Sequence, residues 1–484
     1  MIIHRSIVWS KIVDWTTQES DVVSGYFDNF ECGESLLHDN SFYSGLVPWL
    51  KKHGVSVDIE SDSIQNVIPI QDVDVCYDIL DGLKLRDYQI AATRKAVHFG
   101  RGIIQAPTGS GKTQIAASVY AHLNLYGLVT TMVYLTPTVF LMEQTADKLR
   151  EFGFGSVCKV GGGHKFKFGY DVYVFVIDSA YRGLAKPEIS ECIRNSDMLV
   201  LDEAHHASSK SWTKVCEHCQ APYRFAYTAT VHDDPVKYSY IDLVLIGLVG
   251  PIIFEVRSKE LRDRGYLADP LVTIVKTDSP KVRVYDWSRV YLLGIVENKK
   301  RNTMIMSVAS SCFESGNKIM VFISRKKHGH RLSQGICDQV GSEVCFVHGN
   351  NTVYVYRPSG VVNRHRWSVD KIASYVNDKD RAVLVTTTVL DEGFDVPVIN
   401  VLIMGTAMKK YRRTVQRCGR GMRPKEGQNR VFIFDFYDNN HPYLEKHSKY
   451  RLWTYKTEVF EVSESLQRTS EILGNAIVLE RKAM

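Results

Sequence analysis

Residues 102–113 read GIIQAPTGSGKT, and this stretch decides the fold that the sequence predicts. The apolar run at 102–105 has the character of a buried strand, and the run at 114–122 has helical periodicity. Glycines between a strand and a helix let backbone N–H groups surround an anion at the positive end of the helix. The stretch therefore predicts a phosphate-binding loop on an α/β sheet, with Lys112 reaching the β and γ phosphates and the Thr113 hydroxyl binding Mg²⁺.

The general form of such a loop is GxxxxGK[ST], and Ala106 stands where that form has its first glycine. We interpret this as a variant, because the later glycines and the Lys-Thr pair are intact. A chance glycine-rich turn is the alternative.

Apolar strands followed by helical runs recur along most of the chain, which is typical of parallel α/β sheets. A first series of strands is expected at 102–105, 131–135, 172–177, 198–201 and 224–227. A second series is expected at 318–323, 344–347, 382–386, 400–404 and 430–434. The prediction is an α/β protein with two parallel-sheet domains in tandem, at 85–268 and 269–436. Residues 1–84 would form a small α+β accessory module that binds DNA and ends in an acidic linker, and 437–484 a partly helical tail.

Length and composition agree with a multidomain globular protein. The 484 residues leave room for about three domains, and 44% hydrophobic with 24% charged residues excludes a disordered or fibrous chain. The net charge of +6 is too small to indicate a polyanion partner by itself. However, seven acids and no Lys or Arg lie between His53 and Leu83, so the rest of the chain carries +6 − (−7) = +13.

Cysteine usage and hydropathy suggest a location. Ten cysteines without a leader sequence favour a reducing cytosol, of a bacterium or of a phage-infected host. The longest apolar run, 243–254, is shorter than the roughly twenty residues that span a bilayer, so no membrane segment is expected. Cys216 and Cys219 have half the spacing of a zinc site, but no second pair completes it, and ordinary reduced cysteines are the favoured interpretation.

The strand at 198–201 is followed by Asp202-Glu203-Ala204-His205. Phosphoryl transfer needs a carboxylate at the end of a neighbouring strand, to hold Mg²⁺ and orient the attacking water. Asp202 is the expected metal-side carboxylate, and Glu203 is expected to polarise the water. Acids after a buried strand can also be a helix N-cap, which is the alternative.

A second catalytic element is expected in the later domain, where residues 416–423 read QRCGRGMR. Arg420 and Arg423 are three residues apart, so on a helix they would share one face and could stabilise the transferring phosphate as arginine fingers. A solvated basic helix is the alternative.

These segments, taken in order, resemble the motif series of superfamily 2 helicases of the DExH type. The matching segments, which span roughly 85–436, are 86–89 (RDYQ), 106–113, 137–138, 202–205, 228–230, 322–325, 387–397 and 416–423. The resemblance implies two RecA-like motor domains that hydrolyse ATP with Mg²⁺. More loosely, 261–270 (LRDRGYLADP) and 44–59 resemble bacteriophage helicases of the UvsW kind, which are related to RecG-type branch-migration motors.

The resemblance assigns roles to individual residues. The catalytic group would be Lys112, Asp202, Glu203, Gln416, Arg420 and Arg423. Nucleotide contacts would come from Arg86 and Gln89 at the adenine, from Ala106, Pro107, Thr108, Gly109, Ser110, Gly111, Lys112 and Thr113 at the phosphates, and from Gly393 and Asp395 at the ribose. Nucleic-acid backbone contacts would come from Pro137, Thr138, Gly162, Ser179, Ser324, Arg325 and Thr387. Coupling of hydrolysis to motion would fall to His205, Thr228 and Thr230.

One segment departs from the family pattern. Residues 352–367 alternate β-forming side chains on both sides of Pro358-Ser359-Gly360, which predicts a β-hairpin. Its acid-free, aromatic and basic composition suits a strand-separating or junction-stabilising pin. The residues expected to contact nucleic acid are Tyr354, Tyr356, Arg357, Arg364, Arg366 and Trp367. An edge hairpin packed on the second domain is an equal alternative.

A weaker candidate is 165–170, where Lys and Phe alternate before Tyr170. It could hold a backbone and stack a base, although an ordinary strand with an exposed Lys face is the favoured interpretation.

The predicted function is an ATP-dependent helicase or translocase that remodels forked and branched DNA through sequence-independent backbone contacts. An RNA helicase is the nearest alternative, since these motifs grip backbone. A nucleic-acid clamp that binds ATP without using it is an alternative of another class, and a nuclease subunit is disfavoured because no third domain carries clustered carboxylates.

Overall fold

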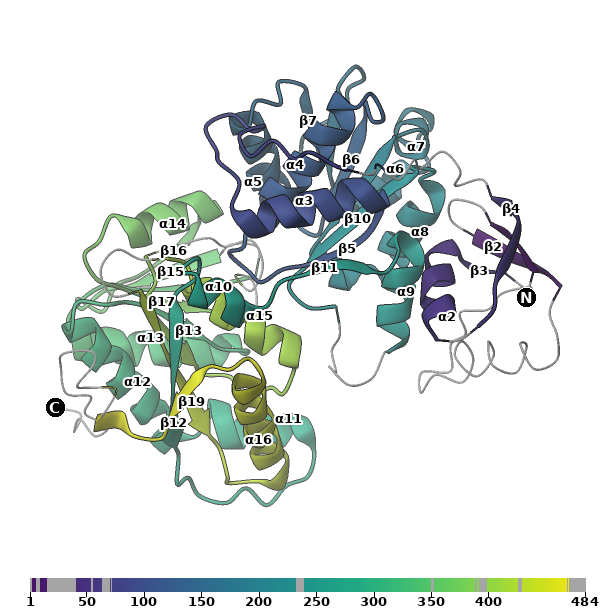
Figure 1. The fold of residues 1–484 in the computed structure, drawn as a ribbon. Coiled ribbons are helices and arrows are strands. Elements are labelled where there is room, and N and C mark those ends of the chain that lie inside the picture. The colour runs from purple at the N-terminus through teal and green to yellow at the C-terminus, as the bar shows by residue number, and fades with distance from the viewer. Residues whose placement is uncertain are drawn as a thin grey trace. The chain divides into compact units, whose positions relative to one another are not determined.

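The computed structural model describes residues 2–5, 9–14, 41–53, 55–62, 70, 72–231, 239–349, 352–387, 390, 398–424, 429–467 and 469. The chain divides into two compact units (Figure 1). The first unit comprises Met1–Pro107 and Gly111–Arg257, and the second comprises Thr108–Ser110 and Ser258–Met484. Each contains a parallel sheet covered by helices, so the predicted α/β class with two RecA-like domains is confirmed.

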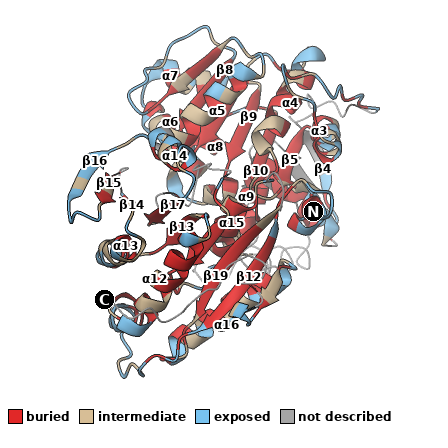
Figure 2. Ribbon diagram, turned by 90° about the vertical axis from the view of Figure 1, so that its left-hand side faces the viewer, coloured by how far each residue is buried: buried red, intermediate tan, exposed pale blue. Residues whose placement is uncertain are grey.

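The main sheet of the first unit has the order β11-β5-β10-β9-β6-β8-β7 among the described strands, and all its pairings are parallel. The strands are β5 (Arg101–Gln105), β6 (Met132–Thr136), β7 (Val157–Val160), β8 (Val172–Val176), β9 (Met198–Asp202), β10 (Tyr223–Thr228) and β11 (Ile252–Glu255). The five strands predicted in this region are present, whereas β7 and β11 were not predicted. Both faces of the sheet are covered, so most residues of its strands are buried (Figure 2).

Two apolar cores cover the two faces of this sheet. One face packs against α3 (Asp87–Phe99), α4 (Lys112–Leu125) and α5 (Val139–Glu151). The other packs against α6 (Ile177–Gly183), α7 (Pro187–Arg194), α8 (Lys210–His218) and α9 (Tyr240–Val249). The apolar run at 243–254 therefore supplies a buried helix and an edge strand. None of the described helices combines the length and the apolar character that a membrane span requires.

The N-terminal residues form a small mixed sheet that belongs to the first unit. Its strands, in the order β3-β2-β1-β4, are β1 (Ile2–Arg5), β2 (Trp9–Asp14), β3 (Ser41–Tyr43) and β4 (Asp58–Asp62). The short helices η1 (Ser44–Leu46) and α2 (Val47–Lys52) follow β3. Leu46 and Trp49 share an apolar core with α9, and the Tyr43 hydroxyl donates to Glu217 Oε1 at 2.9 Å. The accessory module is thus packed against the motor domain that follows it.

The described strands of the second unit have the order β16-β15-β14-β17-β13-β18-β19-β12-β20. They are β12 (Asp269–Lys276), β13 (Lys318–Phe322), β14 (Val344–His348), β15 (Thr352–Tyr356), β16 (Val362–Arg366), β17 (Ala382–Thr386), β18 (Val401–Met404), β19 (Arg430–Tyr437) and β20 (Glu461–Ser463). Pairing is parallel except where β15 joins β14 and β16. The five predicted strands and the predicted hairpin are present, whereas β12 and β20 were not predicted.

The helices of the second unit include part of the sequence that was expected to be a tail. They are α10 (Ser258–Asp263), α11 (Trp287–Tyr291), η3 (Leu292–Val296), α12 (Lys299–Glu314), α13 (Lys326–Val340), α14 (Val369–Asn377), α15 (Tyr411–Gly421) and α16 (Pro442–Thr457). Helix α16 packs on α15, and β20 pairs with β12. Residues 442–463 are therefore structural parts of the second unit.

A buried ion pair joins α12 to the end of β19. Arg301 Nε lies 2.8 Å from Asp438 Oδ1, and both side chains are fully buried. Arg301 also donates to the carbonyl of Gly405 at 3.0 Å. Burial raises the pKa of Asp438, and the Arg301 charge opposes that shift. Removal of either partner would leave an uncompensated charge in the interior.

We expect Asp438→Ala to lower the free energy of unfolding of the second unit by about 3–5 kcal/mol, because Arg301 would stay buried without its counterion. Chemical denaturation followed by circular dichroism measures this. The control is Glu464→Ala, which breaks an ion pair to Lys276 whose side chains are 62% and 66% exposed and which should change stability little. Equal effects of the two substitutions would contradict the assignment.

Candidate nucleotide and nucleic-acid sites

The phosphate loop joins β5 to α4 as predicted. Gly109 and Gly111 have φ values of +86° and +78°, which favour glycine. A Cβ on Gly111 would lie 2.1 Å from Gln114 Oε1 and 2.5 Å from Gln89 Nε2. Ala106 is not among the residues with positive φ, and its backbone N–H donates to the Thr228 carbonyl at 3.0 Å. The backbone at this position therefore does not need glycine, which explains why alanine is tolerated.

Lys112 and Asp202 face each other across this loop. The Lys112 Nζ is held near the carbonyls of Ala106 and Pro107, at 3.4 and 3.5 Å. Asp202 ends β9 and is 5% exposed. Burial, assisted by the Glu203 charge, raises the pKa of Asp202 to about 6, while the Lys112 charge opposes the shift. The predicted lysine and carboxylate are thus brought together in the first unit.

These residues fit a magnesium ion. The Thr113 hydroxyl and the buried Asp202 carboxylate are oxygen donors of the kind that Mg²⁺ prefers, and a cation there would offset the cost of burying the carboxylate charge. Asp202 and Thr113 both affect the pKa of Tyr134 on β6. The two predicted magnesium ligands therefore lie near the same tyrosine hydroxyl. Thr113 and Asp202 would hold the ion, which would offset charge on the phosphates.

Glu203 is held in an unusual backbone conformation beside Asp202. Its φ is +45°, which costs strain for a residue with a side chain, and such strain is concentrated at functional sites. Its backbone N–H donates to Asp202 Oδ1 at 2.9 Å. Its carboxylate Oε2 lies 3.5 Å from Nδ1 of His205, in a largely buried pair. The carboxylate predicted to polarise water therefore contacts a residue predicted to couple hydrolysis to motion.

The other predicted coupling residues lie at the end of β10. The Thr228 hydroxyl donates to the Thr230 carbonyl at 3.0 Å, and the Thr228 carbonyl accepts from the N–H of Ala106. The phosphate loop and this segment are consequently joined by a backbone hydrogen bond, through which a shift in one would move the other.

Gln89, predicted to contact adenine, is buried next to Gly111 of the phosphate loop. It is 1% exposed, accepts from the backbone N–H of Arg86 at 2.9 Å, and donates to Gln114 Oε1 at 2.7 Å. Gln114 was not singled out from the sequence. Its signal was its place two residues after Lys112, on the turn that follows the loop.

The predicted nucleic-acid contacts of the first unit gather at one edge of the sheet, where β6, β7 and β8 end. Thr138 follows Pro137 after β6 and caps α5, where its hydroxyl accepts from the N–H of Leu141 at 3.2 Å. The turn at Gly162 follows β7, and Cβ atoms on Gly161 and Gly162 would meet Ser179 Oγ at 2.9 Å and Val139 Cγ1 at 2.4 Å. These contacts join residues that are 179 − 161 = 18 and 162 − 139 = 23 positions apart, so the three segments are adjacent.

The segment at 165–170 continues from this turn as a loop, so the favoured interpretation as a strand was wrong. Phe166 packs on Tyr173 with ring centres 5.4 Å apart, whereas Phe168 is 64% exposed. Pairing between β7 and β8 ends before this segment, which leaves it outside the sheet.

In the second unit, Ser324, Arg325 and Thr387 lie beyond the adjacent strands β13 and β17. The N–H of Ile323 donates to Thr386 at 2.9 Å, and that of Thr387 donates to Val347 at 3.1 Å. These hydrogen bonds hold the three predicted contacts at one sheet edge. Glu392, Gly393 and Asp395 lie outside the described residues.

The segment with Gln416, Arg420 and Arg423 forms α15 only as far as Gly421. Arg420 is helical, but Arg423 lies past the helix end, so the prediction that both share one helix face was wrong. Pro424 explains the difference, because the residue before a proline disfavours the helical conformation. Gln416 is 6% exposed and belongs to the interior side of the helix.

The predicted hairpin is present, but its two strands differ in exposure. In β15, Tyr356 is 4% exposed and its hydroxyl bonds to His330, so its predicted use in base stacking was wrong. Tyr354 stacks on His348 with ring centres 5.5 Å apart. The side chains of β15 face the core because this strand extends the buried sheet.

The second strand, β16, is an exposed sheet edge that carries Arg364 and Arg366. Trp367, just beyond it, stacks on His365 at 5.4 Å and lies under Lys371. Arg357 in the turn pairs with Glu343 at 2.8 Å, and this pairing lowers the pKa of Glu343 to about 2. Arg357 thus anchors the hairpin, while the β16 arginines point outward.

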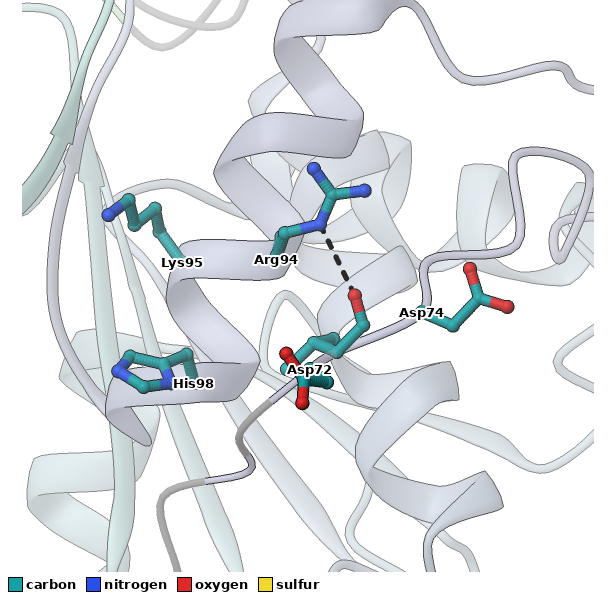
Figure 3. A pocket seen from close by; sticks show the side chains of 6 residues that line it. Asp72, Asp74, Arg94, Lys95 and His98 are labelled. Atoms are coloured by element: carbon teal, nitrogen blue, oxygen red, sulfur yellow. Dashed lines mark hydrogen bonds between the residues drawn. The ribbon is translucent and has the colours of Figure 1, made fainter.

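A separate hollow of about 510 Å³ lies where the acidic stretch crosses α3 (Figure 3). Arg94, Lys95 and His98 of α3 line one side, and Asp72 and Asp74 the other. Arg94 Nε donates to the Val73 carbonyl at 3.2 Å. The acidic residues therefore lie beside bases of the first unit, and none of the lining residues belongs to the phosphate loop.

Cys216 and Cys219 are buried thiols, and burial raises the pKa of Cys216 to about 12. Within the described part of the chain, no group of three or more His, Cys, Asp or Glu side chains is arranged to hold a metal ion.

A phosphate loop and an Asp-Glu pair on one parallel sheet, followed by a second parallel sheet, define a two-domain nucleotide-driven motor of the RecA-like class. The family model described as the res subunit of type III restriction enzymes matches residues 82–233, and the helicase conserved C-terminal domain matches residues 300–425. The chain belongs to superfamily 2 of the helicases and is an ATP-dependent helicase or translocase.

Known proteins resemble the chain over most of its length. The DNA 3'-5' translocase XPB2 of Sulfurisphaera tokodaii is 26% identical over 72% of this chain and 80% of its own. The structure of S. cerevisiae Dbp5 bound to RNA and ADP BeF3 has a TM-score of 0.55 at 15% identity, over 81% of this chain and 94% of its own. The crystal structure of T4 UvsW aligns with 96% of this chain and 98% of its own at 16% identity, with a TM-score of 0.43.

We expect Glu203→Gln to lower kcat for ATP hydrolysis by about 10²–10⁴-fold, because the amide cannot accept a proton from the attacking water. Nucleotide affinity should change little, since Lys112 and Asp202 remain. Steady-state kinetics and equilibrium binding of a fluorescent nucleotide measure both. Glu151→Gln, an exposed change at the end of α5, is the control. Near-normal turnover by Glu203→Gln would remove Glu203 from the mechanism.

Proposed function

We propose that this protein is a magnesium-dependent DNA translocase that separates or branch-migrates forked and junction DNA. The observation that carries the proposal is one edge of the first unit's sheet, where Asp202 ends β9 and where Lys112, Thr138 and Ser179 follow the ends of β5, β6 and β8. The nucleotide phosphates and the nucleic-acid backbone would then both be bound at the carboxyl ends of the same sheet's strands.

The residues suggest how hydrolysis is coupled to movement. Lys112 would offset phosphate charge, Glu203 would accept a proton from water, and Arg420 would stabilise the transition state. His205 contacts Glu203, and the Thr228 carbonyl accepts a hydrogen bond from the Ala106 N–H of the phosphate loop. A movement of the loop when phosphate binds or leaves would therefore shift the end of β10. Each step moves the motor only if its ligand binds one conformation more tightly than the other.

Two observations favour DNA over RNA as the substrate. The relative that matches along 80% of its length is named as a DNA translocase, whereas the RNA-bound structure shares the fold at 15% identity. Residues 261–270 and 44–59 also resemble phage helicases that act on branched DNA. The accessory module at 1–84 would contribute to this preference, and Lys51 and Lys52 are exposed at the end of α2.

The exposed strand β16 supports a role for the hairpin at the junction. Arg364 pairs across the hairpin with Tyr354, which in turn lies opposite Phe346, so the three share one face of the sheet. Burial lowers the pKa of His348, and the charges of Lys326, His330 and Arg364 lower it further. The positive charges around His348 therefore outweigh the negative ones. A phosphate backbone bound beside Arg364 would supply negative charge to this region.

Substrate class is tested by measuring ATP turnover and strand separation with forks, four-way junctions, linear duplexes and structured RNA. We expect forks and junctions to stimulate turnover most, because they offer single strands beside a duplex for the hairpin. Stronger stimulation by structured RNA would replace the proposal with an RNA helicase. A Lys112→Ala variant that still remodels DNA would favour an ATP-binding clamp instead.

We expect the double substitution Arg364→Gln with Arg366→Gln to weaken binding to forked DNA and to slow unwinding. If both arginines contact phosphates, the slope of log affinity against log salt should fall by about 1.4–1.8, at about 0.7–0.9 for each contact. The matched control is Lys446→Gln with Lys449→Gln on α16, where two exposed charges of the same unit are removed. Thermal unfolding verifies that both variants are folded, and identical salt slopes would exclude β16 from the DNA site.

A further inference from the structure

Two tyrosines stand on either side of the strand that carries Asp202. In the sheet of the first unit, β9 lies between β10 and β6. Tyr227 of β10 is directly opposite Asp202, and Tyr134 of β6 is opposite Val200. Side chains alternate along a strand, and opposite positions of neighbouring strands point to the same face. Both tyrosines and Asp202 therefore face the side of the sheet that α4 covers, where the tyrosine rings join its apolar core.

Both phenol rings are fully buried, yet their hydroxyls are not bonded. Tyr134 and Tyr227 each have 0% exposure. The Asp202 carboxylate and the Thr113 hydroxyl both affect the pKa of Tyr134, so they lie near its hydroxyl. The Asp202 charge also raises the pKa of Tyr227. Neither hydroxyl has hydrogen-bond geometry to any residue that the structure describes. Two buried donors without a partner among the described residues thus lie on the same face of the sheet as the metal-side carboxylate.

Packing alone does not account for these hydroxyls. A buried hydroxyl without a partner is unfavourable, and an apolar residue of the same shape would avoid that cost. The other positions of β6 and β9 on this face are mostly aliphatic, whereas β10 also presents Tyr223 and Phe225 there, so the contrast with the neighbouring residues is sharpest for Tyr134. Phenols are protonated at neutral pH, so both tyrosine hydroxyls are available as hydrogen-bond donors.

We propose that the hydroxyls of Tyr134 and Tyr227 are positioning groups for the magnesium–nucleotide site, which hold the Asp202 carboxylate in the orientation that binds the ion. Oδ1 of Asp202 already accepts a hydrogen bond from the N–H of Glu203. The tyrosine hydroxyls would donate hydrogen bonds to the carboxylate lone pairs that remain. Tyr134, which also faces Thr113, links the two magnesium ligands. Mg²⁺ retains several water ligands when bound, and phenol oxygens can accept hydrogen bonds from such water.

This inference rests on the proposed magnesium role of Asp202 and Thr113, and it does not depend on which nucleic acid the motor uses. It is therefore tested without nucleic acid. The variants are Tyr134→Phe, Tyr227→Phe and the double substitution. The matched control is Tyr223→Phe, since Tyr223 lies on β10 in the same apolar core and has a buried, unbonded hydroxyl whose pKa is raised by burial alone.

The measurement is equilibrium affinity for a fluorescent, non-hydrolysable ATP analogue over a magnesium titration and in EDTA. We expect Tyr134→Phe to raise the half-saturating magnesium concentration about tenfold, as is usual when a group that orients a metal ligand is lost. Affinity in EDTA should stay unchanged, and Tyr223→Phe should match the unsubstituted protein. In an Asp202→Asn background, Tyr134→Phe should have no further effect, because the two act as a unit.

An unchanged magnesium requirement in Tyr134→Phe and Tyr227→Phe would overturn the inference. Equal losses in EDTA and in magnesium would also overturn it, because the hydroxyls would then support the fold alone. If Asp202→Asn itself leaves the magnesium requirement unchanged, the proposed metal role of Asp202 fails instead, so the two failures are distinguishable.

Discussion

Parallel pairing of β9 with β6 and β10 is the constraint on which the rest of this protein depends. Parallel strands need crossover connections, and all their carboxyl ends therefore meet at one edge of the sheet. Residues that are far apart in sequence, such as Lys112, Thr138 and Asp202, are thereby brought to one edge of the sheet. The second unit repeats the arrangement with Ser324 and Thr387 beyond β13 and β17.

The same constraint places charge where burial is costly. Asp202 ends a strand that is otherwise apolar, so its carboxylate lies almost wholly out of water, and its pKa rises to about 6. Glu203 adopts a left-handed backbone conformation next to it. Strain and desolvation of this kind persist only where the surrounding sheet holds them, and a cation bound as proposed would offset the buried charge.

Periodicity in the sequence was enough to locate ten buried strands, the phosphate loop and the hairpin, because each depends on local spacing of apolar, glycine and turn residues. Edge strands such as β11 and β20 were missed, since they are short and only partly buried. The buried strand β12 was missed for another reason, because it begins at Asp269-Pro270, where the sequence predicted the boundary between the two domains. The single helix face expected for Arg420 and Arg423 was wrong because a following proline ends α15 early. Tyr356 was expected at a surface, but β15 extends a buried sheet, and sequence alternation cannot tell which face another element covers.

By itself, the sequence determined the class of this protein, because the phosphate loop, the Asp-Glu pair and the order of the motifs require particular residue types at fixed spacing. Only the tertiary structure decided how those segments meet. It placed Gln89 beneath the loop and His205 against Glu203, and it put Tyr134 and Tyr227 on the same face of the sheet as Asp202. The physical reason is that strand order and register are set by long-range packing, so neighbours across a sheet leave no mark on local sequence spacing.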